Sequence, residues 1–120
     1  MIHVRLFCGG GFSTSLLARK MTDYAAAQGI DATVDAQGVM TISTASVEQL
    51  SELDCALLCP QVGFEANNYF PKFEKAGVPC AVIDMRDYGM VDGAKVMQTA
   101  LDMIEAAKNK SDLKKVHRYF

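Results

Sequence analysis

A cysteine near the start of the chain is followed by three glycines and then by three hydroxyl-bearing residues. The segment reads Cys8-Gly9-Gly10-Gly11-Phe12-Ser13-Thr14-Ser15. Consecutive glycines let successive backbone N–H groups point into one concavity, which can hold an anion. A helix that begins at Ser13 would add its unpaired N–H groups and the positive end of its dipole. This pattern predicts a phosphate site formed by residues 9–15 without a cationic side chain.

Cys8 lies at the mouth of this predicted phosphate site. The field that attracts phosphate also favours the thiolate over the thiol, and a thiolate is a nucleophile toward phosphorus. We interpret Cys8 as a catalytic residue that forms a transient phosphocysteine at a shallow, exposed sulfur. The alternative is a core cysteine that ends a strand before a simple connecting turn. The hydroxyl residues and the helix behind the glycines favour the phosphocysteine.

The residue at the end of this loop distinguishes between phosphate hydrolysis and phosphoryl transfer. Cysteine-dependent phosphatases follow the pattern C-x5-R-[ST], in which the arginine clamps the phosphate and stabilises the transition state. Thr14 occupies the arginine position here. The sequence therefore favours a protein that holds a phosphoryl group and passes it on. A small cysteine-dependent phosphatase is the alternative enzyme, and a non-enzymatic anion-binding module is the alternative outside the enzymes.

Four other polar residues are candidates for a part in this chemistry. Asp84 and Asp87 follow a predicted strand. They either supply a general acid or cap and brace the loop, and we favour the second role. Gln61 either donates to phosphate or is an ordinary turn residue. His3 lies too far upstream on the same strand to activate Cys8.

The remaining cysteines, Cys55, Cys59 and Cys80, lie in or beside apolar stretches. We expect them to be buried thiols that act as small hydrophobic side chains. Neither the cysteines nor the histidines show the spacing of a zinc site. Nothing in the sequence requires a metal or a cofactor.

The elements that position these residues alternate along the chain. The apolar pattern predicts strands at 2–7, 31–36, 55–59 and 78–83, and helices at 13–28, 46–53, 62–75 and 92–108. Gly29 and Gly77 are expected to end two of the helices, and Asp92 to cap the last one. Pro71 is expected to kink or split the third helix. Residues 84–91 are predicted to form a loop.

This alternation predicts a three-layer α/β fold, in which a four-stranded parallel sheet is covered by helices on both faces. Sites in such sheets form beyond the carboxyl ends of the strands, which here are followed by residues 8–15, 60–64 and 84–88. We assign residues 1–108 to one domain and residues 109–120 to a basic, solvated C-terminal extension.

The composition excludes several classes of protein. The chain has 120 residues, of which 50% are hydrophobic and 22% charged, so it can form a core. Its net charge of −2 argues against a nucleic-acid binder. No apolar run has the length of a membrane span, and the glycines after Cys8 interrupt any signal peptide. We expect a cytoplasmic protein.

Three segments of the chain together carry a family resemblance. They are Phe7-Cys8-Gly9-Gly10-Gly11-Phe12-Ser13-Thr14-Ser15-Leu16-Leu17, Leu57-Leu58-Cys59-Pro60-Gln61-Val62, and Val82-Ile83-Asp84 followed by Tyr88-Gly89-Met90-Val91-Asp92-Gly93. In order and spacing, over residues 2–108, the chain resembles the IIB (EIIB) components of the bacterial sugar phosphotransferase system (PTS), lactose/cellobiose type. Cys59 departs from the family pattern, in which a small residue such as glycine is common.

The resemblance implies an architecture similar to that of low-molecular-weight tyrosine phosphatases, with Cys8 as the catalytic residue and residues 9–15 as the phosphate cradle. It implies that Cys8 accepts a phosphoryl group from a phosphohistidine of the EIIA protein. The group then passes to a sugar, such as the β-linked disaccharides cellobiose or lactose, which the membrane EIIC permease binds during uptake. The chain would work in the cytoplasm, transiently at the inner face of the plasma membrane, without nucleic acid and without inserting into the membrane.

Overall fold

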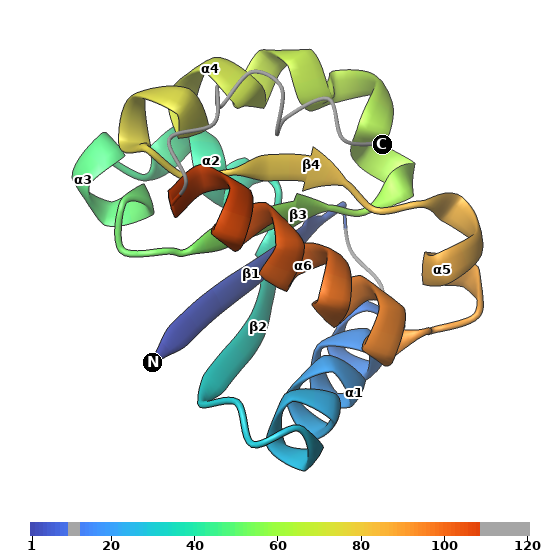
Figure 1. Ribbon diagram of the computed structural model, residues 1–120. Helices are drawn as coiled ribbons and strands as arrows, with labels where there is room; N and C mark the ends of the chain where they lie inside the picture. The colour runs from blue at the N-terminus through green and yellow to red at the C-terminus, as the bar shows by residue number, and fades with distance from the viewer. Residues whose placement is uncertain (10–12, 109–120) are drawn as a thin grey trace.

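The computed structural model describes residues 1–9 and 13–108, which contain a four-stranded parallel sheet (Figure 1). The strands are β1 (Ile2–Cys8), β2 (Ala32–Gly38), β3 (Cys55–Leu58) and β4 (Cys80–Val82). Their order across the sheet is β2-β1-β3-β4, so β1 and β3 are the central strands. The predicted α/β fold with a parallel sheet is confirmed.

Two long helices pack on one face of the sheet. They are α1 (Ser13–Ala27) and α6 (Gly93–Lys108). Leu17 of α1 and Met97 of α6 lie in one fully buried cluster with Val4 and Leu6 of β1. Side chains alternate along a strand, so the even-numbered residues of β1 all face these two helices.

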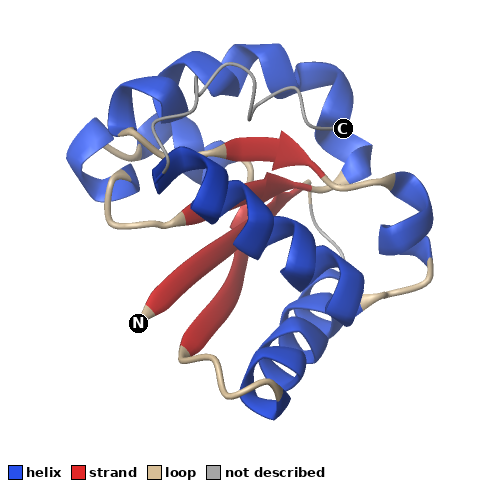
Figure 2. Ribbon diagram, in the orientation of Figure 1, coloured by secondary structure: helices blue, strands red, loops and turns tan. Residues whose placement is uncertain are grey.

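Shorter helices cover the other face, so the predicted three layers are confirmed (Figure 2). They are α2 (Met40–Thr44), α3 (Val47–Leu50), the 3₁₀ helix η1 (Pro60–Glu65) and α4 (Ala66–Ala76). The odd-numbered Phe7 of β1 meets Phe73 of α4 there, and the two ring centroids lie 5.8 Å apart. Both rings are almost completely buried.

The predicted helix boundaries are confirmed at three positions. Gly29, just after α1, has φ 72°, and Gly77, just after α4, has φ 74°. Both are in the left-handed region that glycine adopts without steric cost. At the start of α6, Asp92 Oδ1 accepts a hydrogen bond from the backbone N–H of Lys95 at 3.1 Å.

Three predictions about helices are wrong. The segment 84–91, predicted as a loop, contains the helix α5 (Met85–Gly89), and α2 was not predicted at all. One turn of helix is too short to show a repeating apolar pattern. The helix predicted at 62–75 divides at Glu65, where 3₁₀ geometry gives way to α geometry, whereas Pro71 lies inside α4 without ending it. The predicted extension 109–120 lies outside the described residues.

At the junction between α5 and α6, the start of α6 comes into close contact with α1. A Cβ atom added to Gly93 would lie 2.5 Å from Lys20 Cβ and 2.6 Å from the Lys20 carbonyl carbon, so α6 begins directly against the backbone of α1. Two residues earlier, Val91 has φ 51°, which is rare for a β-branched residue. The absence of a side chain at position 93 therefore sets how closely the two helices pack.

Candidate active site

Cys8 is the last residue of the central strand β1. The chain goes from β1 to β2 on one side and later returns to β3 on the other, so the strand order reverses between β1 and β3. Ligand sites in open parallel sheets form outside the carboxyl ends of the strands at such a reversal. The structure therefore places Cys8 where the sequence predicts a site.

The Cys8 side chain is more covered than the sequence analysis predicts. The residue is 7% exposed and belongs to the apolar cluster between the sheet and the helices α1 and α6. The reason is strand alternation, because Cys8 shares the inward face of β1 with Val4 and Leu6. The expectation of an openly exposed sulfur is wrong. The next residue, Gly9, is exposed, so Cys8 lies at the boundary between core and surface.

Thr14 joins three elements at this end of the sheet. The residue is 1% exposed and lies in the first turn of α1. Its Oγ1 atom lies 3.0 Å from the hydroxyl of Tyr88 in α5 and 3.7 Å from the sulfur of Cys59 after β3. A buried hydroxyl with such partners avoids the free-energy cost of an unpaired polar group. The contacts of Thr14 therefore fix the start of α1 against β3 and α5.

Cys59 lies next to Cys8 and has an unusual ionisation. Burial raises the pKa of Cys59 to about 11. Hydrogen bonds with Thr14 and Tyr88 oppose this rise, while the neighbouring Cys8 sulfur adds to it through its charge and a hydrogen bond. Cys59 therefore keeps its proton at neutral pH and is a neutral thiol beside Cys8.

The other two cysteines, Cys55 and Cys80, are buried thiols with raised pKa values. Burial also raises the pKa values of Cys55 and Cys80. These two residues and Cys59 are 0% exposed, so the prediction of buried side chains is confirmed. All four cysteines are free thiols, as predicted.

The predicted phosphate cradle is described in part. Gly9 lies against η1, since a Cβ atom at position 9 would be 3.6 Å from Val62 Cγ1. Ser13 is the first residue of α1, and Ser15 is exposed in its first turn. The residues of the cradle that lie outside the description are Gly10, Gly11 and Phe12. Phosphate binding by residues 9–15 stays a prediction, and the hydroxyl of Thr14 already has two partners.

The two aspartates after β4 have structural partners. Asp84 caps α5, because its Oδ1 atom accepts hydrogen bonds from the backbone N–H groups of Arg86 at 2.9 Å and Asp87 at 3.3 Å. Asp87 is 6% exposed, and its Oδ1 atom lies 3.3 Å from Lys95 Nζ. The capping and bracing role that we favoured for these residues is confirmed. Gln61 is exposed in η1.

His3 and Arg5 lie on the opposite side of β1 from Cys8. Arg5 makes two hydrogen bonds of 2.9 Å with the carboxylate of Asp35, and His3 Nε2 lies 3.2 Å from the same group. Burial raises the pKa of Asp35, but the hydrogen bonds and charges of Arg5 and His3 outweigh burial, so the pKa is lowered overall. The prediction that His3 does not act on Cys8 agrees with this placement.

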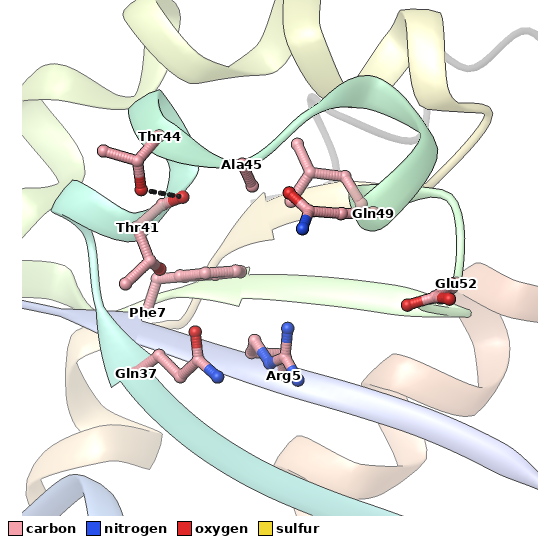
Figure 3. A pocket seen from close by; sticks show the side chains of 9 residues that line it. Arg5, Phe7, Gln37, Thr41, Thr44, Ala45, Gln49 and Glu52 are labelled. Carbon is pink, nitrogen blue, oxygen red and sulfur yellow. Dashed lines mark hydrogen bonds between the residues drawn. The ribbon is translucent and has the colours of Figure 1, made fainter.

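A polar pocket of about 380 Å³ lies beside this ionic cluster, between β1, β2 and the helices α2 and α3 (Figure 3). Arg5, Phe7, Gln37 and Thr41 are among the residues that line it. Because Arg5 and Phe7 are odd-numbered residues of β1, the pocket opens on the sheet face that does not carry Cys8. Among residues 1–9 and 13–108, no group of His, Cys, Asp and Glu side chains is arranged to hold a metal ion.

Sequence reasoning missed the contact among Thr14, Cys59 and Tyr88. These residues are far apart in the chain, with separations of 45 and 74 residues from Thr14. The available signal was position alone, because Cys59 and Tyr88 each follow the carboxyl end of a strand on the same side of β1. Polar or sulfur-bearing residues at such positions in a parallel sheet converge on one site.

The chain matches the family described as "PTS system, Lactose/Cellobiose specific IIB subunit" over residues 3–99. The chain belongs to this family. The matched region contains Cys8, Thr14, Cys59 and Tyr88, and the resemblance inferred from the sequence is confirmed. The protein is thus a PTS EIIB component of the lactose/cellobiose type, and such components are sugar phosphotransferases.

Curated relatives of this EIIB component differ in the sugar that they are named for. The PTS system galactose-specific EIIB component of Lactococcus lactis subsp. cremoris (strain MG1363) is 39% identical over 107 residues, which cover 84% of this chain and 94% of the relative. The PTS system oligo-beta-mannoside-specific EIIB component of Bacillus subtilis (strain 168) is 34% identical over 104 residues, which cover 87% of this chain and 97% of the relative.

Solved structures agree with the fold. The solution structure of the cellobiose-specific phosphotransferase IIB component protein from Borrelia burgdorferi is 33% identical, with a TM-score of 0.69 and coverage of 92% of this chain and 95% of that one. The lactose-specific IIB component domain from Streptococcus pneumoniae has a TM-score of 0.72 at 16% identity, with 84% and 95% of the chains covered. Within the part of the chain that the structure describes, no helix is long and apolar enough to cross a membrane.

Proposed function

We propose that Cys8 accepts a phosphoryl group from a phosphohistidine of the EIIA protein and passes it to a sugar bound by the membrane EIIC permease during uptake. The position of Cys8 carries this proposal. Cys8 ends a central strand at the reversal of strand order, and the chain then leads to the N-terminus of α1. Family membership supports the same role.

The reaction consists of two successive transfers at one sulfur. In the first, the Cys8 thiolate attacks phosphorus, an S–P bond forms, and the N–P bond of phosphohistidine breaks. In the second, a sugar hydroxyl oxygen attacks phosphorus, an O–P bond forms, the S–P bond breaks as the thiolate leaves, and the hydroxyl proton passes to solvent. Such transfers depend mainly on positioning and on stabilising charge on the phosphoryl oxygens.

Different groups around Cys8 stabilise charge on the phosphoryl oxygens and hold the site in position. We assign the stabilisation of charge to the backbone N–H groups of residues 9–15 and to the helix N-terminus. The hydroxyl of Thr14 has a different task, because its bonds to Tyr88 and Cys59 hold α1 in place. No metal and no cofactor take part in this scheme.

The partners must approach Cys8 from the carboxyl end of the sheet. Gly9 and Ser15 are exposed there, whereas Cys8 itself is 7% exposed. Since EIIA and EIIC need the same sulfur in turn, we expect brief encounters through small interfaces. We propose that the transfer takes place in the cytoplasm, at the inner face of the membrane, and that the sugar is a β-linked disaccharide such as cellobiose or lactose.

Intact-mass measurement after incubation with a phosphorylated EIIA donor tests the proposal. The wild-type chain is expected to gain the mass of one phosphoryl group, and Cys8→Ser is expected to gain none. Cys55→Ala is the matched control, because Cys55 is a buried cysteine on the neighbouring strand, and it should be phosphorylated like the wild type. Addition of EIIC-containing membranes and candidate disaccharides should then remove the group and identify the sugar.

Two results would contradict the phosphocarrier role. Phosphorylation of Cys8→Ser by the donor would assign the acceptor to another residue. Steady release of phosphate from an aryl phosphate by the wild type, lost in Cys8→Ser, would instead identify a cysteine-dependent phosphatase.

A further inference from the structure

The sheet places Cys8 and Cys59 side by side at the carboxyl ends of β1 and β3. In the register of these strands, Phe7 lies opposite Leu58. Cys8 directly follows Phe7, and Cys59 directly follows Leu58. The backbone N–H of Cys59 donates to the Phe7 carbonyl at 2.9 Å, so the pairing continues up to the two cysteines. Neighbouring strands lie about 4.8 Å apart. A disulfide joins Cα atoms separated by about 4.4–6.8 Å.

Both side chains also point to the same side of the sheet. Cys8 follows Leu6 on the inward face of β1, and Cys59 follows Leu57 on the same face of β3. All four residues belong to the cluster under α1 and α6. The sulfur atoms therefore face a common space, and the Cys8 sulfur is one of the groups that raise the pKa of Cys59.

We propose that Cys8 and Cys59 are a redox pair that forms a reversible disulfide when the protein meets a peroxide. Cys8 is the residue that peroxide reaches, because it is 7% exposed and adjoins the exposed Gly9, whereas Cys59 is 0% exposed. Cys59 then supplies the second thiol. Burial raises the pKa of Cys59, so its sulfur carries a proton at neutral pH.

The chemistry balances in two steps. In the first, the Cys8 thiol and hydrogen peroxide give a sulfenic acid and water, since one oxygen atom passes to sulfur as the O–O bond breaks. In the second, the Cys59 thiol attacks this sulfur, an S–S bond forms, and the hydroxyl leaves as water with the thiol proton. The two thiols together lose two electrons and two protons, and the peroxide is reduced to two water molecules. A dithiol reductant reverses the change.

The other cysteines do not fit this role. Cys55 lies opposite Val4, four positions before Cys8 on β1, which corresponds to about 13 Å along a strand. Cys80 lies opposite Ala56 and belongs to the cluster on the other face of the sheet. Cys55 and Cys80 are therefore built-in controls for nonspecific oxidation.

The disulfide would also block phosphoryl transfer, because a sulfur bound to another sulfur has no thiolate to attack phosphorus. This consequence rests on the proposed function of Cys8, whereas the disulfide itself does not. Reduction restores the thiolate, so formation of the disulfide would inhibit phosphoryl transfer reversibly.

Mass spectrometry of the full chain after treatment with hydrogen peroxide tests the pair. The sample is denatured and alkylated with N-ethylmaleimide before intact-mass and peptide analysis. The wild type is expected to take up two N-ethylmaleimide groups where the reduced protein takes up one on each of its four cysteines, to show one linkage between the Cys8 and Cys59 peptides, and to recover with dithiothreitol. Cys59→Ala should show no such linkage, and dimedone should trap a sulfenic acid at Cys8. Cys55→Ala should behave like the wild type.

Several results would overturn the redox pair. They are overoxidation of Cys8 in the wild type without a linkage, a linkage to Cys55 or Cys80, or an equal loss of two N-ethylmaleimide groups in Cys59→Ala. Circular dichroism checks the fold of that variant, and Cys59→Ser replaces it if folding fails. The linkage map of the wild type needs no variant.

A second arm separates the redox pair from the phosphocarrier role. Phosphorylation by the EIIA donor is measured on reduced, oxidised and re-reduced wild type, and we expect full labelling, loss of labelling and recovery. If the linkage forms but reduced protein is never labelled, the phosphocarrier role fails and the redox pair stands. If reduced protein is labelled but no linkage forms, the redox pair fails alone.

Discussion

The polar groups on the two faces of the sheet differ in their burial and in their charge. Under α1 and α6, the hydroxyl of Thr14 is buried and bonds to Tyr88 and Cys59. On the other face, Arg5 and Asp35 form an ion pair that is partly exposed, beside an open polar pocket. Neutral hydrogen bonds keep their strength away from water, whereas exposed charges are screened. The cysteine site thus lies on the face where a single polar contact matters more.

The prediction with the largest expected effect tests whether the core on the pocket face of the sheet is tightly packed. Phe73 is fully buried against Phe7 on the pocket face, so Phe73→Ala should lower the free energy of unfolding by about 3–5 kcal/mol. Urea denaturation provides the measurement. Phe64 is 85% exposed, and Phe64→Ala should change the free energy by less than about 0.5 kcal/mol. Equal effects of the two changes would mean that the pocket face has no tight core.

The second prediction concerns the packing of the cysteine face. Gly93→Ala places a methyl group against the backbone of α1 at Lys20, so we expect a loss of about 1–3 kcal/mol in the same measurement. Gly89 has nothing within 4 Å of an added Cβ atom, and Gly89→Ala is the matched control with an expected change within about 0.5 kcal/mol. Tolerance of alanine at both positions would show that α1 and α6 can move apart.

The third prediction compares two tyrosine hydroxyls. Tyr88→Phe removes one of the two partners of the buried Thr14 hydroxyl and should cost about 1 kcal/mol. Tyr24→Phe removes a hydroxyl that bonds to Gln98 at 3.2 Å on the surface, where water can replace it, and should be close to neutral. If thermal unfolding ranks the two variants the other way, the buried network is not the stronger one.

The smallest effect belongs to the ion pair of the pocket face. Asp35 is 42% exposed at its side chain, so Asp35→Asn should cost at most about 1 kcal/mol at neutral pH. The pKa of Asp35 is lowered in the folded state, so its contribution exists above the unfolded pKa and is lost as pH falls through the folded value. The gap between the melting temperatures of variant and wild type should therefore close in acid. A gap that persists once pH has fallen below the folded pKa of Asp35 would point to packing instead of charge.

Much of the fold could be predicted because its signals are local. The apolar alternation of β1, the stop at Gly29 and the cap at Asp92 each depend on neighbouring residues, and all were found where expected. The helices α2 and α5 were not predicted, since five residues provide too little repeat to detect. The strand order β2-β1-β3-β4 depends on long-range pairing, which no local pattern specifies.

The site was predicted less completely, and for the same reason. Cys8 and its loop are one continuous segment, so the sequence showed them together. The convergence of Cys59 and Tyr88 on Thr14 exists only once four strands and two helices are in place. The cover over Cys8 was also missed: alternation with Val4 and Leu6 gives the direction of its side chain, but the helices that cover that face come from distant parts of the chain.

The outer strands of the sheet also bear on how copies of the chain behave toward one another. Each of them pairs with a single neighbour among the described residues, which leaves rows of N–H and C=O groups able to recruit a foreign strand. β4 has only 3 residues, and β2 has a charge at Asp35 in its middle. A short strand and a charged one are poor templates for stacking. Both features lower the tendency of the sheet edges to aggregate with other chains.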